Sequence, residues 1–431
     1  MKYFYILFFL VFSTLNAAKI DANLEIVKKA NTIPNVVVSI ANDSKEIQTL
    51  SKLKFLLEQD LKISGHFDVI KDTYLTSFDA YPNFAILSNN KADLYINLSA
   101  TKNQNGTYAV NMKLYDVNGQ LNILQKTFTT SKIDRFPFLA HRIAITVNDY
   151  FKAPSIDWMD KFVIMSIYKD SKEADIVIAD YSLTFRKTLV TGGLNIFPKW
   201  ASDEQKEIYY TSYNYANPTL VKLNIYTSKK ETVMSSDGMI TCSDVSSDGS
   251  KLLITAAPNS QPDIYVYDKR TKQKQRVTTY SGIDVSGKFI DDEQRVIFVS
   301  NRLGSPNIFA KKINSRAVEK LVYHSSNNSS VTTKGNNIVY ASRDSANAFG
   351  GKNFNLYLMS TKSDSLTRLT VSGVNQFPNF SADGESLIFI KTQNDVSSVG
   401  ILRLNFNSTY LFPLKGNKIQ SIDWWQLKLH W

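Results

Sequence analysis

Cysteine and histidine are scarce in this chain of 431 residues, and their scarcity excludes several kinds of site. Cys242 is the one cysteine, so it has no partner for an internal disulfide, and we expect a buried thiol within a strand. The four histidines, at positions 66, 141, 324 and 430, are far apart in the sequence. With no Cys/His cluster and no H-E-x-x-H motif, the sequence predicts no metal site and no cofactor.

Catalytic signatures are also missing from the sequence. It contains no G-x-S-x-G motif and no glycine-rich phosphate loop. Acidic residues recur at one position per repeat, at Asp203, Asp248, Asp291 and Asp383, but turn chemistry explains them without a catalytic or calcium-binding role. We therefore predict no catalytic residues and no enzyme activity.

Long apolar runs are limited to one, Tyr3–Phe12, which is too short to span a bilayer. It follows a positive Lys2 and precedes small residues, so residues 1–18 are predicted to be a cleaved export signal ending at Ala17 or Ala18. An uncleaved membrane anchor is the alternative.

The net charge of +11 suggests an acidic partner, or simply a requirement for solubility. The densest basic run, 269–276, lies in a predicted hairpin turn, so we do not expect nucleic-acid binding.

The first part of the mature chain predicts a mixed helix-and-strand domain. Residues 19–31 have weak periodicity and are expected to be a flexible segment, followed by an α+β domain over residues 32–152. A helix is predicted from a cap at Asp43 or Ser44 to Gly65, with leucines 50, 53, 57 and 61 on one face. Strands follow, including a hairpin with Gly106 at its tip, and a second helix lies within 136–151.

The remaining sequence repeats a strand–turn–strand unit. Its turn residues are at positions 204, 249, 293, 335 and 384, with spacings of 45, 44, 42 and 49 residues. Such a period, built from short strands, is typical of a β-propeller. We predict an all-β six-bladed propeller over residues 159–431, in which the C-terminal strand 419–425 completes the first blade and closes the ring.

The loops that enter the innermost strands are expected to surround one mouth of the channel. They contain small residues beside apolar and amide groups, which suits a concave protein-binding surface, although ordinary connections are an equal alternative. The candidate binding residues in these loops are Asn195, Met239, Thr241, Ile283, Asp284, Asn328, Asn375, Gln376 and Gln420.

Several segments together resemble the TolB family of the Tol–Pal system of Gram-negative envelopes. They are "ISGHFDVI" at 63–70, the hairpin at 92–117, the blade motifs "FPKWASDE" and "FPNFSADG", and the closing "IQSIDWW" at 419–425. The resemblance covers nearly the whole chain. Two blade motifs depart from it, "DVSGKFIDDE" at 284–293 and "SSVTTKG" at 329–335.

The resemblance implies a non-enzymatic adaptor in the periplasm. It implies that the mouth loops bind the Pal lipoprotein and that the mature N-terminus binds TolA, supporting outer-membrane integrity and constriction during division. The N-terminal residues concerned are Ala18, Lys19, Ile20, Asp21, Leu24 and Ile26. We expect a monomer that is peripheral to the outer membrane through Pal and does not span a membrane. The alternatives are an exported propeller enzyme and a peptidoglycan-binding lectin that would use Trp424, Trp425 and Trp431.

Overall fold

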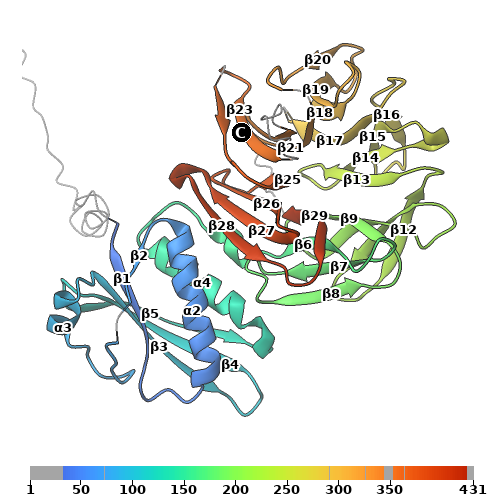
Figure 1. The fold of residues 1–431 in the computed structure, drawn as a ribbon. Coiled ribbons are helices and arrows are strands. Elements are labelled where there is room, and N and C mark those ends of the chain that lie inside the picture. Colours follow the sequence, from blue (N-terminus) through green and yellow to red (C-terminus); the bar gives the residue numbers. More distant parts are fainter. Residues whose placement is uncertain are drawn as a thin grey trace, which may run out of the picture. The chain divides into compact units, whose positions relative to one another are not determined.

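Figure 1 shows the computed structural model, which describes residues 33–71, 73–290, 292–325, 327–343, 353–363 and 365–424. The described residues form two compact units. One comprises the described residues up to Ser131 together with Arg142–Ile156, and the other comprises Lys132–His141 together with the described residues from Asp157 onward. The predicted export signal and the segment 19–31 lie outside the described residues.

The first unit contains a five-stranded sheet with the strand order β2-β1-β3-β4-β5. β1 is parallel to β2 and β3, whereas β3, β4 and β5 are successive antiparallel hairpins. The strands are β1 (Asn35–Ile40), β2 (Asp68–Val69), β3 (Leu94–Lys102), β4 (Tyr108–Asp116) and β5 (Leu121–Thr130), and the helices are α2 (Ile47–Ser64), α3 (Phe84–Asn89) and α4 (Phe136–Tyr150). Figure 1 shows α2 lying across this sheet. The predicted hairpin tip is confirmed, because Gly106 has a φ of +82° between β3 and β4.

The helix α2 has the predicted leucine stripe and the predicted end. Its four stripe leucines, at positions 50, 53, 57 and 61, are fully buried. Gly65 follows the last turn with a φ of 77°, and its N–H donates to the carbonyl of Lys62 at 3.2 Å. Glycine takes this left-handed conformation without a Cβ clash, so the helix stops where the sequence predicted.

The predicted N-cap of α2 is wrong. Glu46 is the cap residue, and its side chain makes no capping hydrogen bond. The Ser44 hydroxyl accepts instead from the N–H of Ala100 at 3.1 Å, and the Asp43 carboxylate accepts from the N–H of Phe78 at 3.0 Å. Both side chains are therefore used to satisfy backbone groups elsewhere in the unit.

The helix α4 divides between the two units, which the sequence analysis did not anticipate. Its first residues, up to His141, belong to the second unit. There the Phe138 ring packs edge-on against Phe162 at 5.0 Å and against Phe185 at 5.6 Å between ring centroids. These aromatic contacts explain why the start of the helix separates from the 32–152 domain to which the sequence analysis assigned it.

The second unit consists of short antiparallel strands. They are β6 (Val163–Tyr168), β7 (Ala174–Ala179), β8 (Arg186–Val190), β9 (Asn195–Trp200), β10 (Glu207–Ser212), β11 (Thr219–Asn224), β12 (Lys230–Ser235), β13 (Ile240–Val245), β14 (Lys251–Ala256), β15 (Asp263–Asp268), β16 (Lys274–Arg276), β17 (Asp284–Ile290), β18 (Arg295–Ser300), β19 (Asn307–Lys312), β20 (Val318–Lys320), β21 (Asn328–Lys334), β22 (Asn337–Arg343), β23 (Phe354–Ser360), β24 (Leu366–Arg368), β25 (Val374–Phe380), β26 (Ser386–Gln393), β27 (Val396–Arg403), β28 (Ser408–Pro413) and β29 (Lys418–Trp424).

Most of these strands form four-stranded sheets. Among the described residues the sheets are β29-β6-β7-β8, β9–β12, β13–β16 and β17–β20, together with an eight-stranded sheet that contains β21–β28. In the largest sheet one parallel pair, Phe354 with Val374, links β23 to β25. Because this pair joins two of the expected blades, the number of blades stays a prediction.

The strand β29 comes from the end of the chain and pairs with β6, far away in the sequence. Trp424 lies opposite Val163, and Lys418 lies opposite Tyr168. The pairing covers an edge of β6 that would otherwise expose unpaired backbone groups. Trp425, which the sequence analysis included in this strand, lies outside the described residues.

The core of the second unit lies between neighbouring sheets. Trp200 of β9 packs in one cluster with Ile164 of β6, and Phe380 of β25 packs in another with Val339 of β22. Strand-rich sheets with their cores between them, after a unit with helices and one sheet, confirm the predicted fold class of an α+β domain followed by a propeller-like domain.

Candidate protein-binding site

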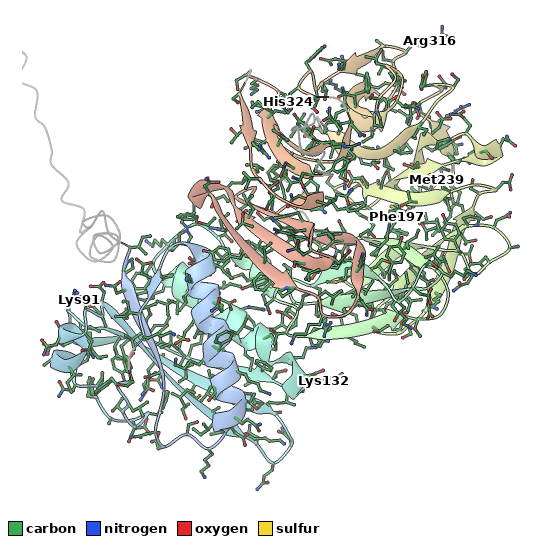
Figure 2. All side chains as sticks on the ribbon, viewed as in Figure 1. Lys91, Lys132, Phe197, Met239, Arg316 and His324 are labelled. Atoms are coloured by element: carbon green, nitrogen blue, oxygen red, sulfur yellow. The ribbon has the colours of Figure 1, made fainter. Side chains whose placement is uncertain are left out.

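Six strands of the second unit, β9, β13, β17, β21, β25 and β29, surround a cavity of about 360 Å³. We call these the inner strands and the space the channel cavity. Phe197, Met239, Val331, Phe377 and Ile422 contribute apolar surface to its wall. Figure 2 shows Phe197 and Met239 close to each other. A concave apolar wall of this size can accept an anchoring side chain of a protein partner.

A bulge in each inner strand gives the channel cavity its shape. The pairing of all six with their neighbours shifts register near the middle of the strand. At the bulge, Phe197, Ser286, Ser330 and Phe377 have φ values of 54°, 58°, 46° and 53°. Bulges redirect side chains locally. Proline follows both phenylalanines, and its missing N–H favours a break in the ladder there.

A buried ion pair lies beside the bulges. The Lys199 ammonium is 2.6 Å from the Asp423 carboxylate, and the side chains are 12% and 4% exposed. The other oxygen of Asp423 accepts from the N–H of Trp200 at 3.0 Å. Burial lowers the pKa of Lys199, but the carboxylates of Asp423 and Asp244 outweigh it, so the pKa lies above its ordinary value. Lys199 is therefore charged at neutral pH and links β9 to β29.

Other polar side chains of the inner strands also connect one inner strand to the next. The Asp244 carboxylate on β13 accepts from the N–H of Phe289 on β17 at 2.9 Å. The Asn379 amide on β25 donates to the carbonyl of Ile422 on β29 at 3.3 Å. These bonds hold the inner strands at fixed spacings, so the channel cavity has a preformed wall.

Five of the nine predicted mouth residues lie in or near this site. Met239 and Thr241 line the channel cavity. The Gln420 side chain accepts from the N–H of Phe197 at 3.4 Å, and Gln376 is half-buried next to Phe377 in β25. Ile283 is 47% exposed in the loop before β17. Contact of these five with a partner stays a prediction.

The other four predicted residues are fully buried at the start of their strands. They are Asn195, Asp284, Asn328 and Asn375. Each of the three asparagine amides donates to the carbonyl three residues earlier, at 2.9, 3.5 and 2.9 Å for positions 195, 328 and 375. The Asp284 carboxylate makes two bonds, of 3.0 and 2.9 Å, to the Arg302 guanidinium. These side chains fasten the mouth loops from below and do not reach the surface.

Sequence reasoning missed the residues that follow the mouth loops, although a signal was present. The pair Phe-Pro stands at 197–198 and again at 377–378, and all four residues line the channel cavity. The pair marks the repeat in the sequence, and in the structure it also marks the bulge. The six predicted N-terminal binding residues, from Ala18 to Ile26, lie outside the described residues.

The enzyme and lectin alternatives can be compared with the surroundings of the described histidines and of Trp424. His66 bonds to the Asn148 side chain at 2.7 Å, and His141 is fully buried 3.4 Å from Asp180. Trp424, a candidate for stacking on a sugar, is 1% exposed and packs edge-on against Trp158.

Among the described residues no group of three or more His, Cys, Asp or Glu is placed to hold a metal ion. No helix in the described part of the chain combines the length and apolarity needed to cross a membrane.

Two family models match the chain. The model of the TolB amino-terminal domain matches residues 22–123, and the model of the TolB beta propeller domain matches residues 158–424. The two matches follow the order of the two units.

Known proteins are similar over nearly the full length. The Tol-Pal system protein TolB of Wolinella succinogenes is 45% identical over 97% of this chain and 100% of the relative. The protein of the same name from Helicobacter hepaticus is 43% identical over 94% of this chain and 96% of the relative. The crystal structure of TolB from Acinetobacter baumannii superimposes with a TM-score of 0.74 over 91% of this chain and 97% of that one, at 20% identity.

Proposed function

The chain belongs to the TolB family, and from this membership we propose that it is a non-enzymatic periplasmic adaptor of the Tol–Pal system. In this proposal the Pal lipoprotein binds at the channel cavity and TolA binds the mature N-terminus, from Ala18 to Ile26. Together these contacts would support outer-membrane integrity and constriction during cell division.

The channel cavity is the observation that carries the proposal. Its wall presents the half-buried rings of Phe197 and Phe377 beside Met239, and buried polar bonds hold the strands behind it. Interface hot spots concentrate in such preformed pockets, where an aromatic or aliphatic anchor is fully desolvated. Polar groups at the rim, such as Gln376 and Gln420, would set the orientation of the partner.

The proposal is tested by titrating the mature protein with the soluble domain of the Pal lipoprotein from the same organism. Phe197→Asn and Phe377→Asn each remove a ring from the wall, and asparagine accepts the positive φ at these positions. Tyr226→Asn is the matched control, because Tyr226 is 63% exposed and does not line the channel cavity. We expect about 30-fold weaker binding for either channel variant and no change for the control.

A second titration concerns TolA. Removal of residues 18–31 should abolish binding to the soluble domain of TolA and leave Pal binding intact. Full Pal affinity in both folded channel variants would place the Pal site elsewhere. No binding of Pal by the wild-type protein would favour the enzyme or lectin alternatives, which activity on peptide or glycan panels and binding to cell-wall sacculi then separate.

A further inference from the structure

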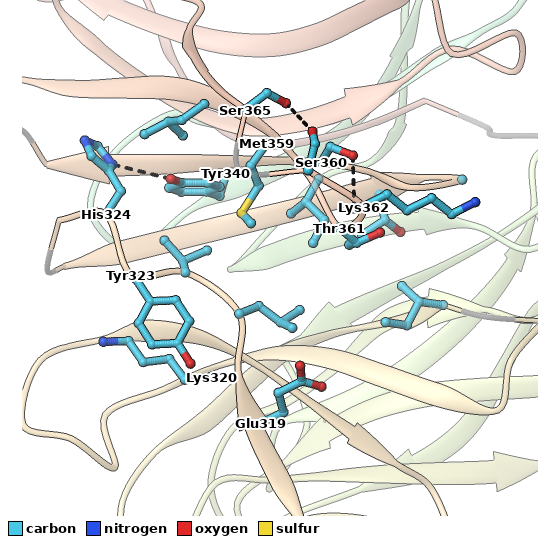
Figure 3. A pocket seen from close by; sticks show the side chains of 18 of the residues that line it. Glu319, Lys320, Tyr323, His324, Tyr340, Met359, Ser360, Thr361, Lys362 and Ser365 are labelled. Carbon is cyan, nitrogen blue, oxygen red and sulfur yellow. Dashed lines mark hydrogen bonds between the residues drawn. The ribbon is translucent and has the colours of Figure 1, made fainter.

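A second cavity lies between the sheets β17–β20 and β21–β28. Its volume is about 660 Å³, and it shares no lining residue with the channel cavity. We call it the side cleft. Figure 3 shows Glu319, Lys320 and Tyr323 on one wall, and Tyr340, Met359, Ser360 and Lys362 on the facing wall. The two walls therefore come from neighbouring sheets.

The side cleft has a local cause in the sequence. Near the end of each inner strand, one residue pairs with the first apolar residue of the next strand in the same sheet. These pairs are Trp424–Val163, Trp200–Ile208, Val245–Leu252, Phe289–Val296, Thr333–Ile338 and Phe380–Leu387. The residue of the inner strand is apolar and buried in five pairs, whereas Thr333 is small, polar and half-buried.

The position of Thr333 is where an apolar side chain fills the space between sheets elsewhere. Phe289 packs with Leu253 and Ile264 of the preceding sheet, and Phe380 packs with Val339 of its preceding sheet. Thr333 lines the side cleft instead. A position that holds an apolar side chain in the other inner strands and a small polar one here therefore accounts for an open cleft at this junction.

The walls of the side cleft combine an apolar floor with a basic rim. Ile290, Leu321, Ile338 and Met359 give apolar surface, and the Tyr340 ring closes one side. At the rim, Arg295 pairs with Glu319 at 2.8 Å. Lys320 and Lys362 also line the cleft, and the Lys320 ammonium lies 5.0 Å from the centroid of the Tyr323 ring. Neither lysine forms an ion pair with a described residue. The rim therefore has two positive charges that no described acidic residue neutralises.

We propose that the side cleft binds a small amphiphilic anion, an apolar chain or ring that carries one carboxylate or phosphate. The volume of the cleft lies within the range of about 300–1,000 Å³ that is usual for small-molecule sites. The apolar body would lie against Ile290 and Met359, in the space beside Thr333. The anionic group would lie at the rim beside Lys320 and Lys362, with the nearby serine hydroxyls as hydrogen-bond donors.

The test is isothermal titration of the full mature protein with decanoate and with decyl phosphate, each below its micelle concentration. We expect saturable binding of one molecule per chain for at least one of the two, and the stronger ligand identifies the preferred head group. Decanol, which has the same apolar body without a charge, should bind at least tenfold more weakly, and acetate should not bind.

Two variants locate the binding. Thr333→Phe restores an aromatic ring at the position that is apolar in the other inner strands, so it should abolish binding of the anion and keep or raise the melting temperature. Lys320→Gln combined with Lys362→Gln should weaken binding about tenfold. The control is Lys187→Gln combined with Lys230→Gln, two exposed lysines outside the cleft, which should leave binding unchanged.

The outcomes separate this proposal from the Pal site. Thr333→Phe should bind the Pal domain with wild-type affinity, because Thr333 does not line the channel cavity. Anion binding that survives both cleft variants would overturn the proposal, as would a wild-type protein that binds neither anion. If Thr333→Phe does not fold, the proposal is decided by whether Lys320→Gln combined with Lys362→Gln weakens binding of the anion.

Discussion

At the scale of single residues, buried polar groups decide how the mouth loops are held. Asn375 donates to the carbonyls of Ser372 and Phe354, each at 2.9 Å, so its amide replaces water for two backbone groups. A buried carbonyl without a partner costs about 1–3 kcal/mol. The asparagines and Asp284 therefore hold the shape of the mouth loops, and we expect any effect on partner binding to come through that shape.

Sequence reasoning identified these positions but not their orientation. An asparagine near a turn can face solvent or fold back onto its own loop, and the local sequence is the same in both cases. Met239, in the loop before β13, and Thr241, in β13 itself, do line the channel cavity. The difference depends on the register of each bulge, which is set by pairing with the neighbouring strand.

The buried thiol of Cys242 leads to a prediction about reactivity and pH. Burial raises the pKa of Cys242 to about 12, and its side chain bonds to the carbonyl of Asp244 at 3.3 Å. The thiolate is the reactive form. We expect no alkylation of the native protein by iodoacetamide at pH 8 and complete alkylation in denaturant, both read by mass spectrometry.

The same pKa shift has a defined sign for stability. The unfolded thiol ionises near pH 8.5, whereas the folded thiol keeps its proton up to about pH 12, so the stabilisation is present below pH 8.5 and is lost as pH rises toward 12. Between pH 8 and pH 10 the wild type should lose about 2 kcal/mol more unfolding free energy than Cys242→Ala. Rapid native alkylation, or equal losses in both proteins, would contradict the prediction.

At the scale of elements, sequence patterns predicted most of the strands and helices, and they predicted the end of α2 but not its start. The leucine stripe predicted α2, Gly65 predicted its end, and Gly106 predicted the tip of the β3–β4 hairpin. These features can be recognised in the sequence because helical periodicity and a positive φ each favour particular residues. The N-cap of α2 and the division of α4 were missed because they depend on distant groups. Ser44 bonds to Ala100, and Phe138 packs against Phe162, and neither contact leaves a local pattern.

The Asp423 side chain makes two of the bonds that attach β29 to β9, and Asp423→Ala tests their contribution. The change leaves the Lys199 ammonium and the N–H of Trp200 without their acceptor. Breaking a buried ion pair costs about 3–5 kcal/mol, so we expect a loss of that size in urea unfolding at neutral pH. Asp423→Asn keeps an acceptor for Trp200 and should lose less.

A double substitution separates the charge from the packing. Lys199→Met combined with Asp423→Leu removes both charges and keeps similar side-chain volume, so it should recover much of the stability that Asp423→Ala loses. A loss below about 1 kcal/mol for Asp423→Ala would show that water compensates the pair. The ladder with β6 and the bonds from the N–H of Phe197 to the Gln420 and Ser421 side chains would then be sufficient to hold β29.

At the scale of the whole molecule, the second unit depends on the pairing of two distant parts of the chain. Lys418–Trp424 pairs with Val163–Tyr168, and the inner strands then bond to one another through Asp423, Asp244 and Asn379. Contacts this distant in sequence carry a loop-closure entropy cost, so we expect each to depend on the others for its stability. Since Ser421, Ile422 and Asp423 of β29 line the channel cavity, we expect the cavity to require this strand.

Truncation tests this dependence. A chain that ends at residue 417 exposes the edge of β6 and removes the buried Trp424, so its melting temperature should fall by about 10 °C or more. The open edge should also cause association at high concentration, visible by size-exclusion chromatography. A chain that ends at residue 424 keeps β29 and is the matched control.

A synthetic peptide of residues 418–424 tests whether the missing strand is the only defect of the shorter chain. If the missing strand is the only defect, the peptide should pair with β6 in the shorter chain and raise its melting temperature. Under the proposed function it should also restore binding of the Pal domain. Recovery of stability without recovery of binding would separate the fold of the second unit from the Pal site. A shorter chain that stays monomeric with an unchanged melting temperature would show that the sheets hold together without the closing strand.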